Sequence, residues 1–267
     1  MNEKLINIFS NDRPVSIDAM TRIRNLLNDW GYTVTSDYCE DASLIICIGG
    51  DGAFLETVHA CNLPQIPILG INTGHLGFFE EITPDEFISF FREYQQGKYR
   101  IQDLNTVEAT VYTNDGHEHH HIGLNEIAIR GRQAYTVHLN LCIDGILIQK
   151  FSGDGILCAT SAGSTAYNYS LGGSIVDPRL DLLQVTPIAP MNSTAYRSFT
   201  SSLLMPSNQP FEVVPEERAD RIFVYNDGID TGYTDVKRIR IQVSDTTIKL
   251  IRFKDYDFWS KVKSKFL

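Results

Sequence analysis

The chain has 267 residues, more than the roughly 100–200 of a usual single domain, so it has room for one or two domains. Its hydrophobic share of 43% and charged share of 21% are those of an ordinary globular protein. The formal net charge of −10 argues against nucleic acid or an anionic membrane as a partner. A phosphate ligand must therefore be held by local amides, a few cations or a metal ion.

The sequence also predicts a cytoplasmic protein with reduced thiols. We expect neither a signal peptide nor a membrane span, because residues 1–9 pass directly into a strand-like stretch and a membrane-length apolar run is lacking. The cysteines are odd in number, form no CxxC pair and are best interpreted as buried small hydrophobes: Cys39, Cys47, Cys61, Cys142 and Cys158.

Residues 1–99 alternate strand and helix signals. Four strands are expected, the last two apolar enough to be covered on both faces of a sheet: 5–9, 32–35, 43–48 and 66–71. Three helices are expected, one from Pro14 to a stop at Gly31, one after Gly52 and one from Pro84. This alternation predicts an α/β domain with a mostly parallel, Rossmann-like sheet.

Residues 100–252 follow a different pattern. Strand-like runs rich in Val, Ile, Thr and Tyr alternate with Asn-Asp-Gly, Gly-Asp-Gly and proline signals, and one helix-like segment at 164–171 interrupts them. We predict a second, β-rich domain that resembles a β-sandwich. Residues 253–267 look like a short amphipathic C-terminal helix. Its basic residues are expected on a solvated face, with packing against the N-terminal domain as the alternative.

The first candidate site is the loop Gly49-Gly50-Asp51-Gly52, between a predicted buried strand and a predicted helix. Open α/β sheets bind ligands at such points, where glycines let the backbone approach a phosphate and the helix N-terminus offers free N–H groups. A carboxylate there is repelled by phosphate unless it serves a cation or receives a proton from a hydroxyl. Asp51 therefore suits phosphoryl transfer to an alcohol, as metal partner, general base or both. A tight strand-to-helix turn explains the four residues equally well on their own.

A second cluster combines Asp154, flanked by glycines, with a run of small and hydroxyl residues from Thr160 to Ser170. Small residues leave room for a flat ligand, hydroxyls and free amides can bind sugar or phosphate, and Tyr167 offers a stacking face. Alone, this run is better explained as a turn that caps a helix. The pair Asn125-Glu126 can hydrogen-bond ribose hydroxyls or an adenine edge, but in isolation ordinary turn chemistry explains it too.

Two histidine features remain open. The tract at 117–121 resembles a metal-binding tract, but it follows a hairpin-turn signal, and consecutive histidines on a strand point to opposite faces. A solvated loop is therefore favoured. His75 is interpreted either as a phosphate ligand or as a structural loop histidine.

In order and spacing, these segments resemble the NAD kinase family. The Gly-Gly-Asp-Gly loop is shared with diacylglycerol-type lipid kinases and phosphofructokinases, whereas the stretches at 72–78 and 163–167 are more specific to NAD kinases. The matching residues are 48–52, 54–55, 70–78, 124–126, 153–155, 163–168, 170–173 and 226–228.

The resemblance implies transfer of a phosphoryl group from ATP, or in some members polyphosphate, to the adenosine-ribose 2′-hydroxyl of NAD. It also implies a divalent metal cation, expected to be Mg²⁺, an α/β domain followed by a β-rich domain, and a homodimer or homotetramer. Asp51 would be the catalytic base. The implied binding residues are Gly49, Gly50 and Gly52 of the loop; Phe78, Asn125 and Glu126, which with Gly52 hold the adenosine part; Asp154, Thr165, Ala166, Tyr167 and Ser170, which line the dinucleotide pocket partly across a subunit interface; and Asp227, near the phosphates.

The chain departs from the family pattern in two places. Ser152 stands where many relatives have arginine, which puts one phosphate contact in doubt, and residues 159–163 lack the usual proline. Two other functions compete with the kinase acting on NAD. A lipid or sugar kinase would share the Gly-Gly-Asp-Gly loop without needing residues 163–167. A dinucleotide-binding regulator would gain nothing from Asp51.

Overall fold

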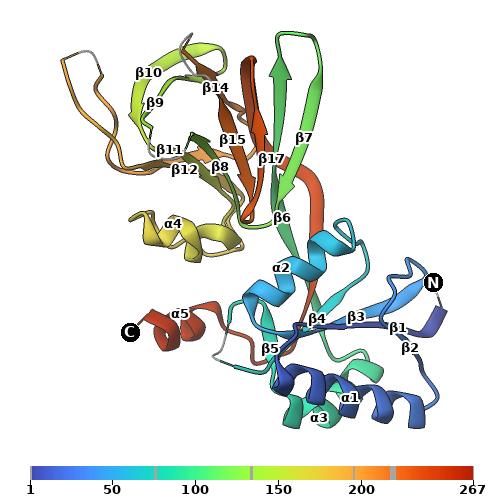
Figure 1. Cartoon of the computed structure of the whole chain (residues 1–267). Coiled ribbons are helices and arrows are strands. Elements are labelled where there is room, and N and C mark those ends of the chain that lie inside the picture. The colour runs from blue at the N-terminus through green and yellow to red at the C-terminus, as the bar shows by residue number, and fades with distance from the viewer. Residues whose placement is uncertain (1, 75–76, 133–134, 195, 217–220, 267) are drawn as a thin grey trace. The chain divides into compact units, whose positions relative to one another are not determined.

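The computed structural model describes residues 2–74, 77–132, 135–194, 196–216 and 221–266 (Figure 1). The chain divides into two compact units: unit 1 comprises Met1–Leu104 and Thr247–Leu267, and unit 2 comprises Asn105–Thr246. Each unit has its own sheet and core. The domain boundaries that we predicted at residues 99 and 252 remain a prediction.

Unit 1 contains a parallel sheet in the order β2-β1-β3-β4-β17. Its strands are β1 (Asn2–Ser10), β2 (Thr33–Thr35), β3 (Ala42–Gly49), β4 (Ile68–Asn72) and the last residues of β17 (Val236–Arg252). The short strand β5 (Glu80–Ile82) pairs with β4, also in parallel. The α/β prediction with a mostly parallel sheet is confirmed here, whereas β5 was not expected.

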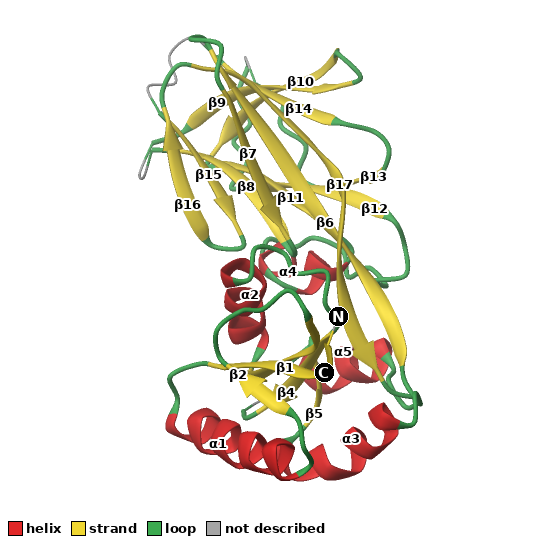
Figure 2. Ribbon diagram, turned by 90° about the vertical axis from the view of Figure 1, so that its right-hand side faces the viewer, coloured by secondary structure: helices red, strands yellow, loops and turns green. Residues whose placement is uncertain are grey.

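Helices cover both faces of this sheet (Figures 1 and 2). Helices α1 (Pro14–Asp29) and α3 (Phe87–Gln95) lie on one face and α2 (Asp51–Ala60) on the other. Helix α1 starts with proline in its first turn and is followed by Gly31 at φ +81°, a conformation that glycine adopts without strain. The core joins apolar residues of the strands to α1 and α3, among them Ile6, Leu44, Ile46, Ile23 and Phe91. The C-terminal helix α5 (Phe258–Phe266) also belongs to unit 1.

Unit 2 is a β-sandwich (Figure 2). One sheet has the order β10-β9-β14-β17, with β6 pairing β17 and β7, and the other has the order β13-β12-β11-β8-β15-β16. Apolar side chains of both sheets share one core, including Val107 and Leu139 from the first and Ile127 and Ile156 from the second. The predicted β-rich, sandwich-like fold is confirmed. Its strands are β6 (Arg100–Thr113), β7 (Glu118–Gly123), β8 (Glu126–Gly131), β9 (Val137–Ile143), β10 (Ile146–Gly153), β11 (Gly155–Ala159), β12 (Leu182–Ile188), β13 (Leu203–Pro206), β14 (Phe211–Pro215), β15 (Ile222–Asn226) and β16 (Ile229–Tyr233).

The predicted helix-like segment at 164–171 is split in two. A 3-10 helix, η2 (Ala162–Thr165), is followed by α4 (Tyr167–Ser170), and Ala166 between them has φ −96° and ψ −130°, which no helix permits. A second 3-10 helix, η1 (Pro84–Glu86), precedes α3 and is started by a capping box of Thr83 and Glu86. Within the described ranges, no helix combines the length and apolarity needed to cross a membrane.

Candidate active site

The Gly49–Gly52 loop of unit 1 comprises the last residue of β3, the N-cap residue Gly50 and the first two residues of α2, which begins at Asp51 rather than after Gly52 as predicted. Gly49 leaves no space for a side chain, because a Cβ atom there would lie 2.5 Å from the Ala53 Cβ and 2.9 Å from the Asn11 Nδ2. Added Cβ atoms at Gly50 and Gly52 would meet nothing within 4 Å. The backbone on that side of the loop is therefore open to a ligand.

Backbone amides fix the Asp51 side chain in one orientation. Its Oδ1 accepts hydrogen bonds from the N–H groups of Phe78, at 2.8 Å, and Phe79, at 3.0 Å. Its Oδ2 contacts the Nζ atom of Lys265 in α5, at 2.7 Å. The carboxylate remains 27% exposed, so Asp51 is fixed by the backbone and is still accessible to a ligand.

Glu80 lies beside Asp51 and was not predicted. A Cβ atom at Gly77 would lie 2.0 Å from the Glu80 Oε2 and 2.5 Å from the Asp51 Oδ1, which brings both carboxyl groups to one point. Glu80 is 2% exposed, and its Oε2 has no hydrogen-bond partner among the described residues. Burial, followed by the nearby Asp51 charge, raises the pKa of Glu80 to about 8.

Helix α5 packs against the same segment. The Phe78 ring lies 5.8 Å from the Phe258 ring and 5.9 Å from the Phe266 ring, and Lys265 Nζ is 4.7 Å from its centroid. Phe78 is only 7% exposed. The ring expected beside adenosine is thus covered by α5 in this structure. The sequence favoured a solvated basic face for this helix, but Lys265 contacts Asp51 and Lys261 Nζ contacts the Glu80 carbonyl oxygen.

In unit 2, Asp227 organises the loop before β8. Its Oδ2 accepts the Leu124 N–H at 2.6 Å, and its Oδ1 accepts the N–H groups of Asn125 at 2.8 Å and Glu126 at 3.1 Å. Asp227 itself has φ +48°, a left-handed conformation that aspartate tolerates better than most residues. Both of its oxygens therefore shape the 124–126 loop.

The side chains that this loop presents carry unused acceptors. Asn125 Oδ1 and Glu126 Oε2 are buried and have no hydrogen-bond partner within the described part of the chain. Burial, with a further contribution from the Asp227 charge, raises the pKa of Glu126 to about 8, while a hydrogen bond from the Tyr167 backbone N–H acts in the opposite direction. A buried polar atom without a hydrogen-bond partner destabilises the folded protein, and a bound ligand can supply the missing partner.

The Thr160–Ser170 segment divides into structural and exposed residues. Thr160 Oγ1 donates to the Leu124 carbonyl at 2.8 Å, and a Cβ atom at Gly163 would lie 1.9 Å from the Asn125 carbonyl oxygen, so this segment packs directly on the loop. Asn168 is fully buried and accepts a hydrogen bond from Thr186 at 2.6 Å. Tyr167 is 37% exposed, Ser170 is exposed, and Thr165 and Ala166 are half-buried.

Comparison with known proteins identifies the family of the chain. The model of the ATP-NAD kinase N-terminal domain matches residues 2–99, and that of the ATP-NAD kinase C-terminal domain matches residues 124–253. An NAD kinase of Finegoldia magna is 39% identical over 271 residues, covering 100% of this chain and 99% of that protein. The chain belongs to the NAD kinase family. The predicted family and the predicted class of enzyme, an NAD kinase, are confirmed.

A further relative and two solved structures are also similar to this chain. An NAD kinase of Staphylococcus carnosus is 32% identical over 231 residues, covering 85% of this chain and 86% of that protein. The fold is shared with yeast NADH kinase complexed with NADH, at a TM-score of 0.85 and 21% identity over 98% of this chain and 86% of that one. It is also shared with an NAD kinase from Archaeoglobus fulgidus in complex with ATP, at a TM-score of 0.76 and 23% identity over 97% and 99% of the two chains.

The two departures from the NAD kinase pattern have a structural setting. Ser152 is 5% exposed, and its N–H and carbonyl groups both contact the Ser198 Oγ at 3.3 Å, so it faces the interior. Asp154 is 52% exposed, and its Oδ2 lies 3.7 Å from the Arg130 guanidinium. A cation is therefore present beside Asp154 although Ser152 supplies none.

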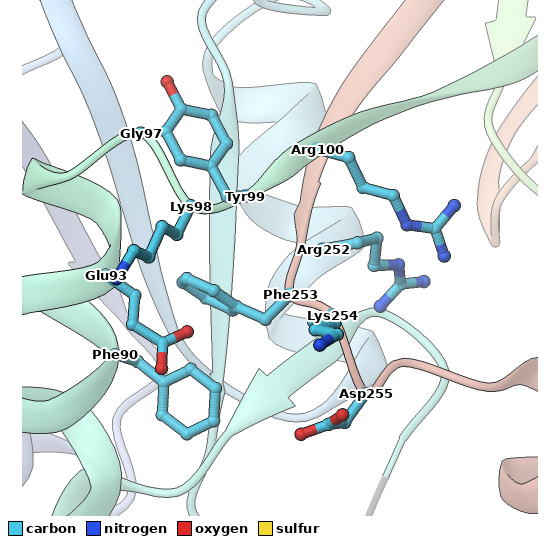
Figure 3. A pocket seen from close by; sticks show the side chains of 10 residues that line it. All are labelled: Phe90, Glu93, Gly97, Lys98, Tyr99, Arg100, Arg252, Phe253, Lys254 and Asp255. Carbon is cyan, nitrogen blue, oxygen red and sulfur yellow. The ribbon is translucent and has the colours of Figure 1, made fainter.

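The remaining candidates do not add to the site. His121 Nε2 lies 2.6 Å from the Tyr233 hydroxyl, and the described residues contain no cluster of three or more His, Cys, Asp or Glu side chains suited to a metal ion. His75 lies outside the described residues. A cavity of about 470 Å³ in unit 1 is lined by none of the predicted site residues (Figure 3); its walls are Phe90, Glu93, Gly97, Lys98, Tyr99, Arg100, Arg252, Phe253, Lys254 and Asp255.

Proposed function

We propose that this chain transfers the γ-phosphoryl group of ATP to the adenosine-ribose 2′-hydroxyl of NAD, with Asp51 as the general base. The observation that carries the proposal is the state of the Asp51 carboxylate. Two backbone N–H groups hold its Oδ1, while Oδ2 contacts Lys265 Nζ and keeps a second acceptor position for a hydroxyl. A general base must lie within hydrogen-bond reach of the proton that it removes, and a fixed carboxylate oxygen meets that condition at little entropic cost.

The reaction that this geometry supports is an in-line displacement. Asp51 Oδ2 accepts the proton of the ribose hydroxyl, the hydroxyl oxygen forms a bond to the γ-phosphorus, and ADP leaves with the electrons of the broken P–O bond. The open side of Gly50 and Gly52, at the N-terminus of helix α2, lets phosphate oxygens approach backbone N–H groups. Because the protein carries a formal net charge of −10, such local donors must offset the charge of the phosphates.

The carboxylates of unit 1 also fit a divalent metal, which we propose is Mg²⁺. Mg²⁺ in kinases is usually bound by one or two carboxylates together with substrate phosphates and water. Asp51 and the unpartnered Glu80 Oε2 supply two carboxyl groups at one point. The metal would neutralise charge on the transferred phosphoryl group. Glu80, whose pKa is about 8, must then lose its proton when the metal binds.

In unit 2, Asn125 and Glu126 are proposed to bind the adenosine part of NAD. Their unused buried oxygens require a hydrogen-bonding partner that the described protein does not provide. Glu126 is largely protonated at neutral pH, because its pKa is about 8, so it can donate to an adenine nitrogen or a ribose oxygen. Asp227 is proposed to act through the loop backbone, which its carboxylate holds. Gly49, Gly50, Gly52 and Phe78 remain proposed binding residues of unit 1.

The exposed residues of unit 2 support the remaining proposals. Asp154, Thr165, Ala166, Tyr167 and Ser170 are exposed or half-buried, as residues of a dinucleotide pocket completed by a second subunit would be. We therefore propose a homodimer or homotetramer, whose activity per subunit falls on dilution below the dissociation constant of the assembly. The five cysteines, all free, are consistent with the proposed cytoplasmic location.

The test of this function is direct. The purified protein is incubated with NAD, ATP and MgCl₂, and NADP is measured with an NADP-specific dehydrogenase. We expect NADP to accumulate in proportion to ADP. Parallel reactions with polyphosphate, NADH, a diacylglycerol and a sugar phosphate identify the preferred donor and acceptor. Turnover of a lipid or sugar without formation of NADP would contradict the proposal, and tight NAD binding with no turnover would favour a regulator.

A further inference from the structure

The contact between Lys265 and Asp51 places a cation at the proposed phosphoryl acceptor. Lys265 Nζ lies 2.7 Å from Asp51 Oδ2, although the two residues are 214 positions apart in the sequence. The Lys265 side chain is 36% exposed, so it can change partner without unfolding the helix.

Helix α5 is anchored by other residues. Phe258 and Val262 are both 8% exposed and pack into unit 1, and Lys261 Nζ contacts the Glu80 carbonyl oxygen. Burial lowers the pKa of Lys261 to about 8, as expected for an ammonium group that is largely removed from water. Lys265 follows Lys261 by one helical turn and lies on the same face. The helix therefore presents Lys265 to Asp51 without depending on that contact for its own packing.

The geometry at Asp51 Oδ2 admits Lys265 and a hydroxyl together. A carboxylate oxygen has two acceptor positions, and Lys265 occupies one of those on Oδ2. A hydroxyl that uses the second position lies within roughly 5 Å of the ammonium group, since each is one hydrogen-bond length from the same oxygen. The flexible lysine stem can then reach an oxygen of a phosphoryl group that arrives on that hydroxyl.

We propose that Lys265 is a catalytic residue that moves from Asp51 to the transferred phosphoryl group during the reaction. The inference rests on the proposed function. As the 2′-oxygen bonds to phosphorus and ADP leaves with the electrons of the broken P–O bond, the hydroxyl proton passes to Asp51 Oδ2. Asp51 then no longer attracts the ammonium group, while negative charge develops on the phosphoryl oxygens beside it. Lys265 stabilises that charge and binds the 2′-phosphate of the product.

The proposal predicts different effects of Lys265 on the affinities for NADP and for NAD. The two dinucleotides differ only in the 2′-phosphate, so a residue that binds this phosphate changes the affinity for NADP and leaves the affinity for NAD nearly unchanged. A residue that merely supports α5 would change both affinities together.

The experiment measures both affinities by isothermal titration calorimetry, without ATP or magnesium, for the full-length wild type, Lys265→Gln, Lys265→Arg and Lys263→Gln. Lys263 is exposed on the same helix and controls for loss of a positive charge. We expect Lys265→Gln to weaken NADP binding about tenfold or more, and NAD binding less than about twofold, because one charge-assisted hydrogen bond is lost. Lys265→Arg should retain most of the NADP affinity, and Lys263→Gln should match the wild type.

Turnover provides the second measurement. The kcat of Lys265→Gln with NAD and ATP should fall about 30-fold or more, while the KM for NAD stays within about threefold. Thermal unfolding of each variant establishes that α5 remains folded. An unchanged ratio of NADP to NAD affinity in a folded Lys265→Gln, or a kcat that rises because a blocking contact is removed, would overturn the proposal. Absence of NADP formation by the wild type would contradict the proposed function instead, and the binding comparison needs no turnover.

Discussion

Asp51 in unit 1 and Asp227 in unit 2 each precede a glycine, and each collects backbone N–H groups from a distant segment. Both carboxylate oxygens of Asp227 accept backbone hydrogen bonds, from Leu124, Asn125 and Glu126. In Asp51, only Oδ1 accepts backbone hydrogen bonds, whereas Oδ2 contacts a lysine side chain that is 36% exposed. Similar motifs thus have different contacts: a carboxylate with both oxygens on amides fixes a loop, whereas one with an oxygen on a partly exposed lysine can exchange partners, as the proposed base must.

The largest effect is expected from Asp51→Asn. An amide cannot accept the hydroxyl proton, so kcat should fall about 1000-fold, within the range attributed to general-base catalysis. The free energy of unfolding and the dissociation constant for NAD should change little, since Asn Oδ1 can still accept the Phe78 and Phe79 N–H groups. Steady-state kinetics and calorimetry measure both. Turnover within a few-fold of wild type would remove Asp51 from the base role.

Gly77→Ala should give the next largest loss. The new Cβ atom would lie 2.0 Å from Glu80 Oε2 and 2.5 Å from Asp51 Oδ1, so the two carboxyl groups must move apart. A displacement of about 1 Å at a catalytic group costs about 100-fold in kcat. Gly74→Ala in the same segment is the matched control, because its Cβ would only touch Arg13 at 3.8 Å. Equal kcat values for the two variants would contradict the proposed pairing.

Asp227→Asn should affect stability and binding rather than the chemical step. Asparagine tolerates the left-handed backbone at this position. Its NH₂ group, however, replaces a carboxylate oxygen that accepts a backbone N–H group, and two donors cannot form a hydrogen bond with each other. We expect the free energy of unfolding to fall by about 2–3 kcal/mol and the affinity for NAD to weaken about tenfold, since the loop that carries Asn125 and Glu126 loosens. Urea unfolding and calorimetry measure these, with the exposed Asp230→Asn as control. A larger loss in kcat than in NAD affinity would assign Asp227 a role in catalysis.

The smallest effect is a pH dependence due to Glu80. Its pKa is raised from 4.5 to about 8, so the folded protein keeps a proton that the unfolded chain loses. The free energy of unfolding should therefore be highest below about pH 4.5 for this group and fall as the pH rises to about 8. Glu80→Gln, which cannot ionise, should gain about 1.4 kcal/mol relative to wild type for each pH unit between about pH 5 and pH 8, by urea unfolding. Glu56→Gln, at an exposed position, should gain nothing.

The elements were predictable where a pattern in consecutive residues decides them. The helical spacing of Ile23 and Leu27 predicted α1, and both residues are buried in its core face. The apolar run at 43–48 predicted β3, whose residues Leu44 to Ile48 are all buried. The break at Ala166 was missed, because it depends on Ser164 and Asn168 bonding to residues 174–176 rather than on local helix propensity.

The site was predictable only in part. Asp51 was predicted from the carboxylate in its glycine loop, and Asn125 and Glu126 were predicted through the resemblance to the NAD kinase family, because ordinary turn chemistry explains that pair in isolation. Glu80 and Lys265 were missed, since nothing in the surrounding residues distinguishes them from surface charges. Their proposed roles depend on contacts between segments that are distant in the sequence. Gly77 has no side chain and so leaves room for Glu80 beside Asp51. The packing of Phe258 and Phe266 around Phe78 places Lys265 next to Asp51.

Strand β17 and helix α5 also affect how the protein is made. Leu250 pairs with Ile68 of β4, and Ile251 and Phe253 belong to the core of unit 1, although most of that core precedes residue 92. A nascent chain leaves the ribosome from its N-terminus, so the first unit to begin synthesis is the last to be completed. Until residues 247–266 emerge, β4 lacks its β17 partner and Asp51 lacks Lys265. The Gly49–Gly52 loop therefore reaches its final state only after residues 247–266 have emerged.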